Sequence, residues 1–479
     1  MSLQQNRKIL SFRSCYEYLD EFVFNLSAHQ FHEKYRDWPG YVGVELEMLP
    51  VHLNSTDLYP PPLSSHNPVH GALQKLANEQ GWELLRERSD FNHNDVMLMI
   101  KIKSGETISF EPGGQVEFSS QPFLCLDAAQ GRLSEIQHLL EVALAKEHLG
   151  LLQVPIDPWH STDEIGIQTP KKRYMAMDQY FRNIASKAGP QMMRQTCSIQ
   201  VCLDFGRSDT SLVNRYLAAQ LLAPFAAVIF AYSPFVEKKR GDFLSTRTSI
   251  WRDLDRGRTG FVGLDRIHRK RDRASCIETY LDFALSCPVV FVEQLGYFVP
   301  SKSISMNEWI ERGINGIFPT LHDFIVHLSL LFPEVRPRAY MELRSVDCQA
   351  RVWQIVPAAF YVGLLYDSQN LESALNLLLP TLAQVDQNML AARLGLQSPA
   401  LQTVSKKLME LAIEGLGRMP GNFCGEQAGR TLMAFYHRFT GQGRTPAEDL
   451  IDSVHKARRL CPSLQDYFRL QDEWQALIV

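Results

Sequence analysis

Four short segments of the chain alternate strictly between apolar and polar residues, which is the pattern of strands with one buried face. They cover residues 42–48, 115–119, 198–204 and 340–344. The apolar positions, which we expect to face the core, are Val42, Val44, Leu46, Met48, Val116, Phe118, Ile199, Val201, Leu203, Met341 and Leu343. Residues 96–103 alternate in their later part and predict one more strand.

Other segments carry apolar residues at helical spacing. These are residues 125–148, closed by Gly150, and residues 174–188, 212–231 and 352–366. From residue 367 to the end the pattern is almost wholly helical. Separate strands mixed with long helices predict an α+β fold with an antiparallel or mixed sheet. We expect a main region over 1–366 and a helical C-terminal region over 367–479, packed on the same domain.

Composition and charge narrow the class of protein. Hydrophobic residues at 45% and a net charge of -4 indicate a globular protein and argue against a general nucleic-acid binder. The apolar run 216–231 is broken by Pro224 and is shorter than the roughly twenty residues of a membrane span, so it predicts a buried helix. Nine cysteines without a CxxC pair, and an N-terminus without a long apolar stretch, predict a cytoplasmic protein with reduced thiols.

Carboxylates concentrate on the polar faces of the predicted strands. They are Glu45, Glu47, Glu111, Glu117 and Glu342. Glu45 and Glu47 are two positions apart, so their side chains project from the same face of a strand. Like charges held close repel one another unless a cation neutralises them, and Mg²⁺ commonly bridges carboxylates to substrate phosphates. The alternative is a set of unrelated surface glutamates, each paired with a lysine.

Glycine and arginine residues near these carboxylates add candidate chemistry. Gly113 and Gly114 form either a plain tight turn or a turn that lets the backbone approach a ligand. Arg344 shares a strand face with Glu342 and is suited to phosphate oxygens, or to a simple surface ion pair. The arginine-rich segment 246–259 fits a nucleic-acid contact, a clamp for a substrate carboxylate, or a solvated loop.

These residues resemble the plant-type glutamate–cysteine ligases, a family that also occurs in bacteria. The resemblance rests on GVELE at 43–47, ISFEPGGQVEFS at 108–119, PKKRY at 170–174, MMRQTCSIQV at 192–201, RTSIW at 247–251, LFPEVR at 331–336 and YMELR at 340–344. The matching motifs follow one another along nearly the whole chain.

Membership of this family would imply a glutamine-synthetase-like fold, in which a curved, largely antiparallel sheet forms an active-site cup wrapped by helices. Residues 1–366 would then be the catalytic region. The five glutamates named above would bind Mg²⁺, Gly113 and Gly114 would lie at the nucleotide, and Arg344 would act at the nucleotide and the transferred phosphoryl group. Arg247 and Trp251 would bind substrate, with Arg247 at the glutamate α-carboxylate.

The implied reaction is the first step of glutathione synthesis. ATP would phosphorylate the glutamate γ-carboxylate, and the cysteine amine would displace phosphate to give γ-glutamylcysteine. The implied partners are ATP, glutamate and cysteine, without nucleic acid or membrane, and the implied state is a monomer or a weak homodimer. Two departures bear on selectivity: residues 48–50 are apolar, and Ser345 stands where the family has glycine. A ligase using another amine, a non-catalytic metabolite-binding relative and a nucleic-acid binder are the alternatives.

Overall fold

The computed structural model describes residues 9–26, 38–54, 57–63, 68–88 and 95–478. Its centre is a nine-stranded sheet in the order β12-β13-β7-β1-β5-β4-β3-β2, with β6 paired to the far end of β1, and every pairing in it is antiparallel. The strands are β1 (Val42–His52), β2 (Glu83–Arg88), β3 (Asp95–Lys101), β4 (Thr107–Phe110), β5 (Val116–Ser119), β6 (Leu149–Leu152), β7 (Ile199–Leu203), β12 (Val335–Pro337) and β13 (Met341–Leu343). The sheet does not close into a barrel, because β2 and β12 remain its two edges.

Two small two-stranded sheets lie outside it. They are formed by β8 (Phe235–Val236) with β9 (Lys239–Arg240), and by β10 (Thr259–Gly260) with β11 (Phe332–Pro333).

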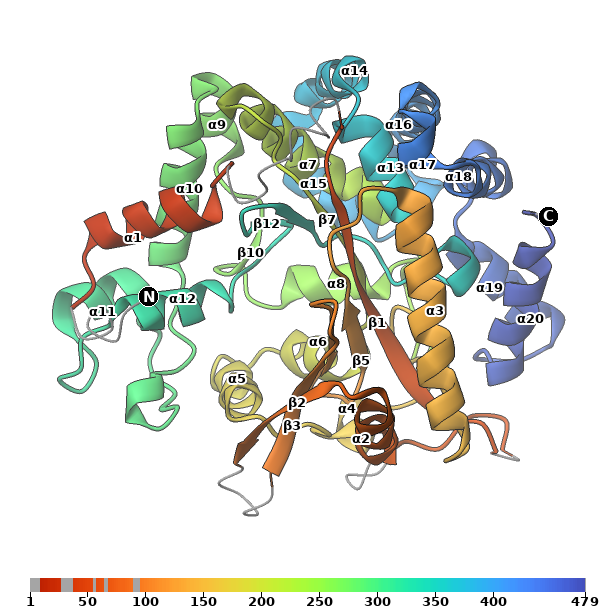
Figure 1. The fold of residues 1–479 in the computed structure, drawn as a ribbon, viewed down its shortest axis with the longest axis horizontal. Helices are drawn as coiled ribbons and strands as arrows, with labels where there is room; N and C mark the ends of the chain where they lie inside the picture. Colours follow the sequence, from red (N-terminus) through yellow and green to blue (C-terminus); the bar gives the residue numbers. More distant parts are fainter. Residues whose placement is uncertain (1–8, 27–37, 55–56, 64–67, 89–94, 479) are drawn as a thin grey trace.

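Helices wrap the sheet on both faces (Figure 1). Before residue 367 they are α1 (Phe12–Tyr18), α2 (Pro68–Gln80), α3 (Leu126–Ala145), α4 (Thr162–Ile165), α5 (Lys172–Asn183), α6 (Ala188–Gln195), α7 (Asp209–Ile229), α8 (Thr246–Asp253), α9 (Leu264–Lys270), α10 (Arg273–Ser286), α11 (Met306–Arg312), α12 (Leu321–Leu328) and α13 (Val356–Leu365). After it they are α14 (Ser368–Leu378), α15 (Val385–Ala392), α16 (Pro399–Arg418), α17 (Gly421–Cys424), α18 (Glu426–Arg438), α19 (Pro446–Lys456) and α20 (Leu464–Gln475).

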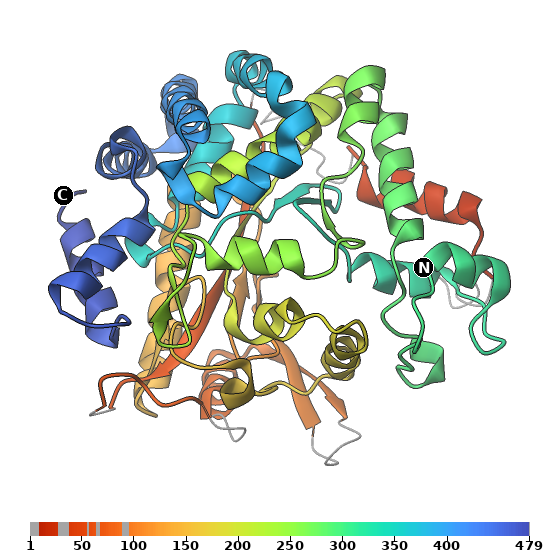
Figure 2. The same ribbon diagram turned by 180° about the vertical axis from the view of Figure 1, so that it is seen from behind.

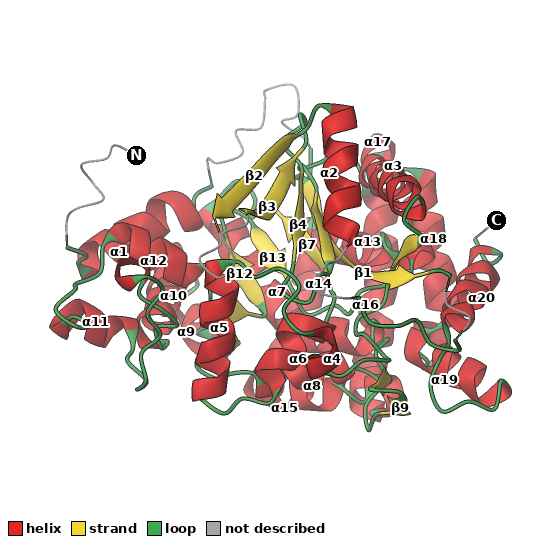
Figure 3. Cartoon of the chain, turned by 90° about the horizontal axis from the view of Figure 1, so that it is seen from below, coloured by secondary structure: helices red, strands yellow, loops and turns green. Residues whose placement is uncertain are grey.

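The two faces of the sheet differ as the alternation predicts. All eleven apolar positions of the four alternating segments are buried, and α3 and α13 pack against this face. Figure 3 shows α2 and α3 on this side of the strands and α5, α6 and α8 on the other side. Seen from behind, α6 and α8 cross in front of the sheet (Figure 2). The polar face therefore looks into a space that these shorter helices enclose. The predicted α+β class with an open, largely antiparallel sheet is confirmed.

The apolar segment around Pro224 is a core helix. Among the described residues, α7 alone has the length and composition of a membrane span, and 94% of its apolar window is buried inside the protein. It packs against α14, α15 and α16 and against α10. A helix that is apolar on all sides is expected to be buried, and the prediction of a buried helix is confirmed.

The helices after residue 366 pack on the earlier part of the chain. Helix α16 lies on α13 and α7, and α18 lies on α13 and α3. These contacts are those expected of a helical region on the same domain. The division at residue 366 stays a prediction.

Three helix boundaries differ from the sequence prediction. Residues 174–188 belong to two helices, because Ala185 adopts a left-handed φ of 53° and Gly189 then packs on Phe181. Residues 352–366 begin as a short 3₁₀ turn, Arg351–Trp353, before α13. Gly150 does not close α3, which ends at Ala145; it lies in β6. Local alternation and spacing define the type of element better than its ends.

Candidate active site

Strand register brings the predicted carboxylates together on the polar face of the sheet. Glu47 of β1 lies directly opposite Glu117 of β5, and Glu45 lies opposite Ser119 on one side and Gln200 of β7 on the other. Directly opposed residues on antiparallel strands have Cβ atoms about 5 Å apart. Two carboxylates are therefore fixed side by side by backbone pairing alone.

These side chains line a cavity of about 370 Å³, which we call the carboxylate cavity. Its acidic wall holds Glu45, Glu47, Glu111 and Glu117. Its basic side chains are Lys171, Arg173, Arg336, Arg338 and Arg344. Its remaining wall is formed by Met99, Thr107, Ser109, Gln115, Ser119, Tyr174, Met177, Met192, Met193, Thr196, Gln200, Trp251, Ser329 and Phe332. The cavity thus presents acidic and basic groups to the same space.

Burial and the repulsion between carboxylates raise the pKa of three glutamates in the acidic wall. Burial, together with Glu117 and Glu111, raises the pKa of Glu47 to about 8. Burial and Glu111 raise the pKa of Glu117 to about 7, against a hydrogen bond from Ser109. The pKa of Glu45 is also raised, by burial first and then by Glu342 and Glu117. A cation in the cavity would favour the charged forms.

The donor set of this wall suits a hard divalent cation. All four candidate ligands are carboxylates, and oxygen ligands of this kind are those that Mg²⁺ prefers. In the described part of the chain, no three His, Cys, Asp or Glu side chains stand close enough together to hold a metal ion by themselves. The fit is therefore to an ion that also takes oxygen ligands from a bound substrate.

Glu342 occupies a different environment from the other four glutamates. It is fully buried and accepts hydrogen bonds from Arg336 at 2.9 Å, from Arg338 at 3.2 Å and from Arg344. Burial alone would raise its pKa, but the three guanidinium groups lower it to about 2. Glu342 is not part of the cavity wall. In this structure Glu342 anchors the arginines, and its predicted role as a metal ligand stays a prediction.

Arg344 lies where the sequence places it, at the polar face of the sheet. Its Nη1 donates to Gln200 Oε1 at 2.6 Å, and its guanidinium lies 5.4 Å from the ring centre of Trp251. Arg336 and Arg338, to which no role was assigned from the sequence, join it at the cavity. The sequence feature that could have identified them is their spacing from Glu342. Arg336 lies in β12, Arg338 lies in the turn that follows, and Glu342 lies in β13, which pairs with β12.

Arg247 and Trp251 meet at a smaller pocket beside the carboxylate cavity. Arg247 is 3% exposed, lies 3.8 Å from Asp347 through Nη1 and donates to the Arg344 carbonyl at 3.2 Å. Among the described residues, neither its Nε nor the indole Nε1 of Trp251 has a hydrogen-bond partner. Arg247, Trp251, Arg344 and Glu334 line this pocket, and Trp251 lines both cavities. The pocket offers unused donors next to the acidic wall.

Backbone conformation and packing explain why Gly113 and Gly114 are glycines without reference to a ligand. A Cβ at Gly113 would stand 2.3 Å from the Arg194 carbonyl oxygen, so this residue permits close packing on α6. Gly114 has a φ of 87° in the turn that carries Glu111, a conformation that favours glycine. Neither glycine lines the carboxylate cavity. Their predicted contact with the nucleotide stays a prediction.

The two departures from the family pattern lie in different places. Met48 is on the buried face of β1, opposite to Glu47, so the apolar continuation at 48–50 begins away from the cavity. Ser345 lines the smaller pocket, and its hydroxyl donates to Glu334 at 2.6 Å. Of the two changes, the serine is the one that lies beside the carboxylate cavity.

Comparison with known proteins identifies the family. The model of the glutamate–cysteine ligase family 2 matches residues 41–463. The chloroplastic glutamate–cysteine ligase of Nicotiana tabacum is 32% identical over 407 residues, covering 80% of this chain and 74% of that protein. The chloroplastic enzyme of Brassica juncea is 31% identical over 451 residues, covering 90% and 80%.

Among solved structures, the glutamate–cysteine ligase of Francisella tularensis in complex with AMP aligns with a TM-score of 0.54. It is 13% identical, with 92% of this chain and 91% of that chain covered. This likeness shows a shared fold.

The prediction of a cytoplasmic protein is wrong by this comparison. The curated relatives are chloroplastic and point to a plastid rather than to the cytoplasm. The prediction used the lack of a long apolar stretch near the N-terminus, which bears on secretory signals. Plastid transit segments are amphipathic and rich in serine and arginine, so this feature does not separate the two compartments.

The raised pKa of Glu117 predicts a pH-dependent stability. The folded protein holds the Glu117 proton more tightly than the unfolded chain, so stability is lost as the pH rises from 4.5 through about 7. Without divalent cations, the free energy of unfolding of Glu117→Gln should exceed that of the parent by about 2 kcal/mol near pH 8. Near pH 4 the two proteins should have the same free energy of unfolding. Urea unfolding in EDTA measures this, with the exposed Glu372→Gln as control. An equal difference at both pH values would contradict it.

Proposed function

The chain belongs to the glutamate–cysteine ligase family 2 and is a ligase; on that premise we propose that it joins the γ-carboxylate of glutamate to the amine of cysteine at the expense of ATP. The observation that carries the proposal is the carboxylate cavity, in which one wall of glutamates faces a group of guanidinium side chains. The product would be γ-glutamylcysteine, the first intermediate of glutathione synthesis. The protein would act on small molecules alone, as a monomer or a weak homodimer, without nucleic acid or membrane.

A carboxylate resists attack by an amine because of its negative charge. Transfer of the ATP γ-phosphoryl group to the glutamate γ-carboxylate forms an acyl phosphate and releases ADP. The cysteine amine then attacks the acyl carbon, loses a proton and expels phosphate. No enzyme nucleophile is needed, so catalysis rests on positioning and charge stabilisation.

The acidic wall would hold the divalent cation that accompanies ATP. Glu45, Glu47, Glu111 and Glu117 are the residues that would hold it, and Mg²⁺ would supply neutralisation of phosphate charge. The repulsion that raises the pKa values of Glu47 and Glu117 would be relieved by that charge. The same glutamates would be poorly suited to bind the polyphosphate directly, because both carry negative charge.

The basic side chains would hold the phosphate oxygens. Arg344 is kept in place by Glu342, Gln200 and the Trp251 ring, so its guanidinium is already oriented towards the cavity. Arg336 and Arg338 share the same anchor. Guanidinium groups fixed before the reaction stabilise the charge that moves during phosphoryl transfer without reorganisation.

The smaller pocket would hold the amino-acid end of glutamate. Arg247 offers an unpaired Nε for the α-carboxylate. Glu334, whose pKa is raised by burial, has Ser345 as its hydrogen-bond donor and no ion pair within 4 Å among the described residues. Its carboxylate is suited to the α-ammonium group. Trp251, which lines both cavities, would separate this end from the reacting γ-carboxylate.

A related ligase that uses another amine is the second candidate. The observation that favours it is Ser345, which replaces a glycine of the family beside the substrate pocket. The methionines Met177, Met192 and Met193 favour cysteine instead, because they line the carboxylate cavity with apolar surface that suits a short thiol-bearing side chain.

Phosphate release from ATP tests the proposed reaction. With Mg²⁺, glutamate and cysteine together, the protein should release phosphate and form γ-glutamylcysteine in equal amounts. Omission of either amino acid should abolish the release, because glutamate is needed to form the acyl phosphate and the amine is needed to displace phosphate from it. Alanine, serine and 2-aminobutyrate in place of cysteine rank the amines. Preference for an amine other than cysteine would establish the second candidate.

The acidic wall predicts a loss of activity in Glu47→Gln. Removal of one anionic ligand should lower kcat/KM by about 100-fold and raise the Mg²⁺ concentration needed for half-maximal rate. The measurement is the initial rate as a function of Mg²⁺ at saturating ATP. Glu372→Gln, on the exposed side of α14, is the control. A variant with the parent's rate and Mg²⁺ dependence would remove Glu47 from the metal site.

The smaller pocket predicts a selective effect of Arg247→Lys. Loss of the planar guanidinium should raise KM for glutamate about tenfold and leave KM for ATP unchanged. Arg252→Lys is a matched control on the same helix, since Arg252 pairs with Asp386 at the surface. If KM for ATP rises as much as KM for glutamate, Arg247 does not mark the glutamate subsite.

A further inference from the structure

Two serine hydroxyls hold the Glu117 carboxylate on the polar face of the sheet. Ser109 of β4 lies directly opposite Glu117 in the strand ladder, and its hydroxyl donates to Glu117 Oε1 at 3.0 Å. Ser119 lies two residues after Glu117 on β5, so its side chain leaves the same face of the strand. The Ser119 hydroxyl donates to the same oxygen at 3.3 Å. Both serines line the carboxylate cavity, so the two hydrogen bonds lie at its wall.

The other oxygen of Glu117 has no such partner. Glu117 is partly exposed and lines the cavity. Among the described residues, no hydrogen-bond donor reaches its Oε2, which is not a buried atom. Glu47, directly opposite on β1, is held in a similar way, because the backbone N–H of Ser198 donates to Glu47 Oε2 at 2.5 Å and no described donor reaches Glu47 Oε1. Each carboxylate of the opposed pair thus has one oxygen bound by the protein and one left free.

Hydrogen bonds to one oxygen prepare a carboxylate to bind a cation through the other. They restrict the rotation of the carboxylate, and loss of such an outer partner typically weakens metal binding. They also favour the charged form, which is the form that binds a cation. Burial and Glu111 raise the pKa of Glu117 to about 7, and the Ser109 hydrogen bond acts in the opposite direction. The two serines therefore favour both the orientation and the charge state of a metal ligand.

From this arrangement we propose that Ser109 and Ser119 are positioning residues for the divalent cation, which they serve by holding Glu117 through Oε1 and leaving Oε2 for the ion. The inference rests on the proposed function, because it requires the acidic wall to hold Mg²⁺ together with the nucleotide. A purely structural role would be different: the hydroxyls would then satisfy a carboxylate of the folded protein, and their removal would change stability without changing the Mg²⁺ requirement.

Binding of a fluorescent nucleotide as a function of Mg²⁺ tests the proposal without turnover. N-methylanthraniloyl-ADP is titrated onto the protein at a series of Mg²⁺ concentrations, without glutamate or cysteine. Ser109→Ala should raise the Mg²⁺ concentration for half-maximal binding about tenfold. Ser119→Ala should raise it by a smaller factor, because its hydrogen bond is longer. At saturating Mg²⁺ both variants should bind the nucleotide as tightly as the parent.

Two further variants separate the hydroxyl from other effects of substitution. Ser109→Thr keeps a hydroxyl on a residue type that suits strands, so its Mg²⁺ requirement should stay within about threefold of the parent. Ser104→Ala is the matched control in the turn between β3 and β4. The Ser104 hydroxyl also donates to a glutamate, Glu106, at 2.7 Å, but neither residue lines the carboxylate cavity. Its Mg²⁺ requirement should equal that of the parent.

Glu117→Gln distinguishes failure of this inference from failure of the proposed function. If Glu117→Gln needs more Mg²⁺ than the parent while both alanine variants follow the parent, the positioning role is overturned and the metal role of Glu117 stands. If nucleotide binding by the parent does not depend on Mg²⁺, the proposed metal site is overturned and the positioning role with it. Weaker nucleotide binding by the alanine variants at every Mg²⁺ concentration, with a lower melting temperature in EDTA, would show a structural role and would also overturn the proposal.

Discussion

The site depends on the forced approach of like charges across the pair β1–β5. Backbone register places Glu47 opposite Glu117, and the strands cannot separate these carboxylates without breaking their ladder. The cost appears as raised pKa values for both residues. A fold keeps such a pair when something bound in the cavity offsets the repulsion. The cation site that we propose at the acidic wall would thus be prepared by the same hydrogen bonds that build the sheet.

The basic side of the cavity also brings like charges together, but these charges are positive. Three arginines stand close together, and the buried Glu342 neutralises part of their charge while fixing their directions. Arg344 gains a further contact from the Trp251 ring. The guanidinium groups therefore stay close together and still have N–H donors available for a polyanion. The two walls together suit a metal–nucleotide complex, whose phosphates need arginines and whose cation needs carboxylates.

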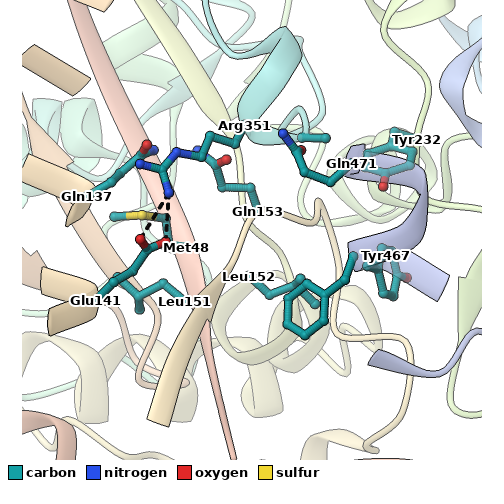
Figure 4. Close-up of a pocket in the computed structure, with 12 residues that line it drawn as sticks. Met48, Gln137, Glu141, Leu151, Leu152, Gln153, Tyr232, Arg351, Tyr467 and Gln471 are labelled. Carbon is teal, nitrogen blue, oxygen red and sulfur yellow. Dashed lines mark hydrogen bonds and ion pairs between the residues drawn. The ribbon is translucent and has the colours of Figure 1, made fainter. Parts of the chain in front are cut away.

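The opposite face of β1 shows what the same strand does for the core. Its apolar side chains are buried, and the strand packs on α3, while the neighbouring strand β7 packs on α13. At Met48 this packing is incomplete, and a cavity of about 170 Å³ opens between α3 and α20 (Figure 4). The C-terminal helices therefore do more than cover the core, because α20 supplies part of that cavity's wall.

Sequence by itself determined which residues alternate, which face of each strand is buried, and that Glu45, Glu47 and Glu117 each lie on the polar face of a strand. These follow from the two-residue period of a strand, which is local. Helix ends, the break at Ala185 and the packing reason for Gly113 depend on neighbours distant in sequence. The same holds for Glu342: its strand position was readable from YMELR, but its three arginine partners come from β12 and the adjoining turn as well as from its own strand. A buried carboxylate can pair with a cationic side chain of the protein or remain available to a ligand. Which of the two occurs depends on which strands lie side by side, so only the tertiary structure decides it.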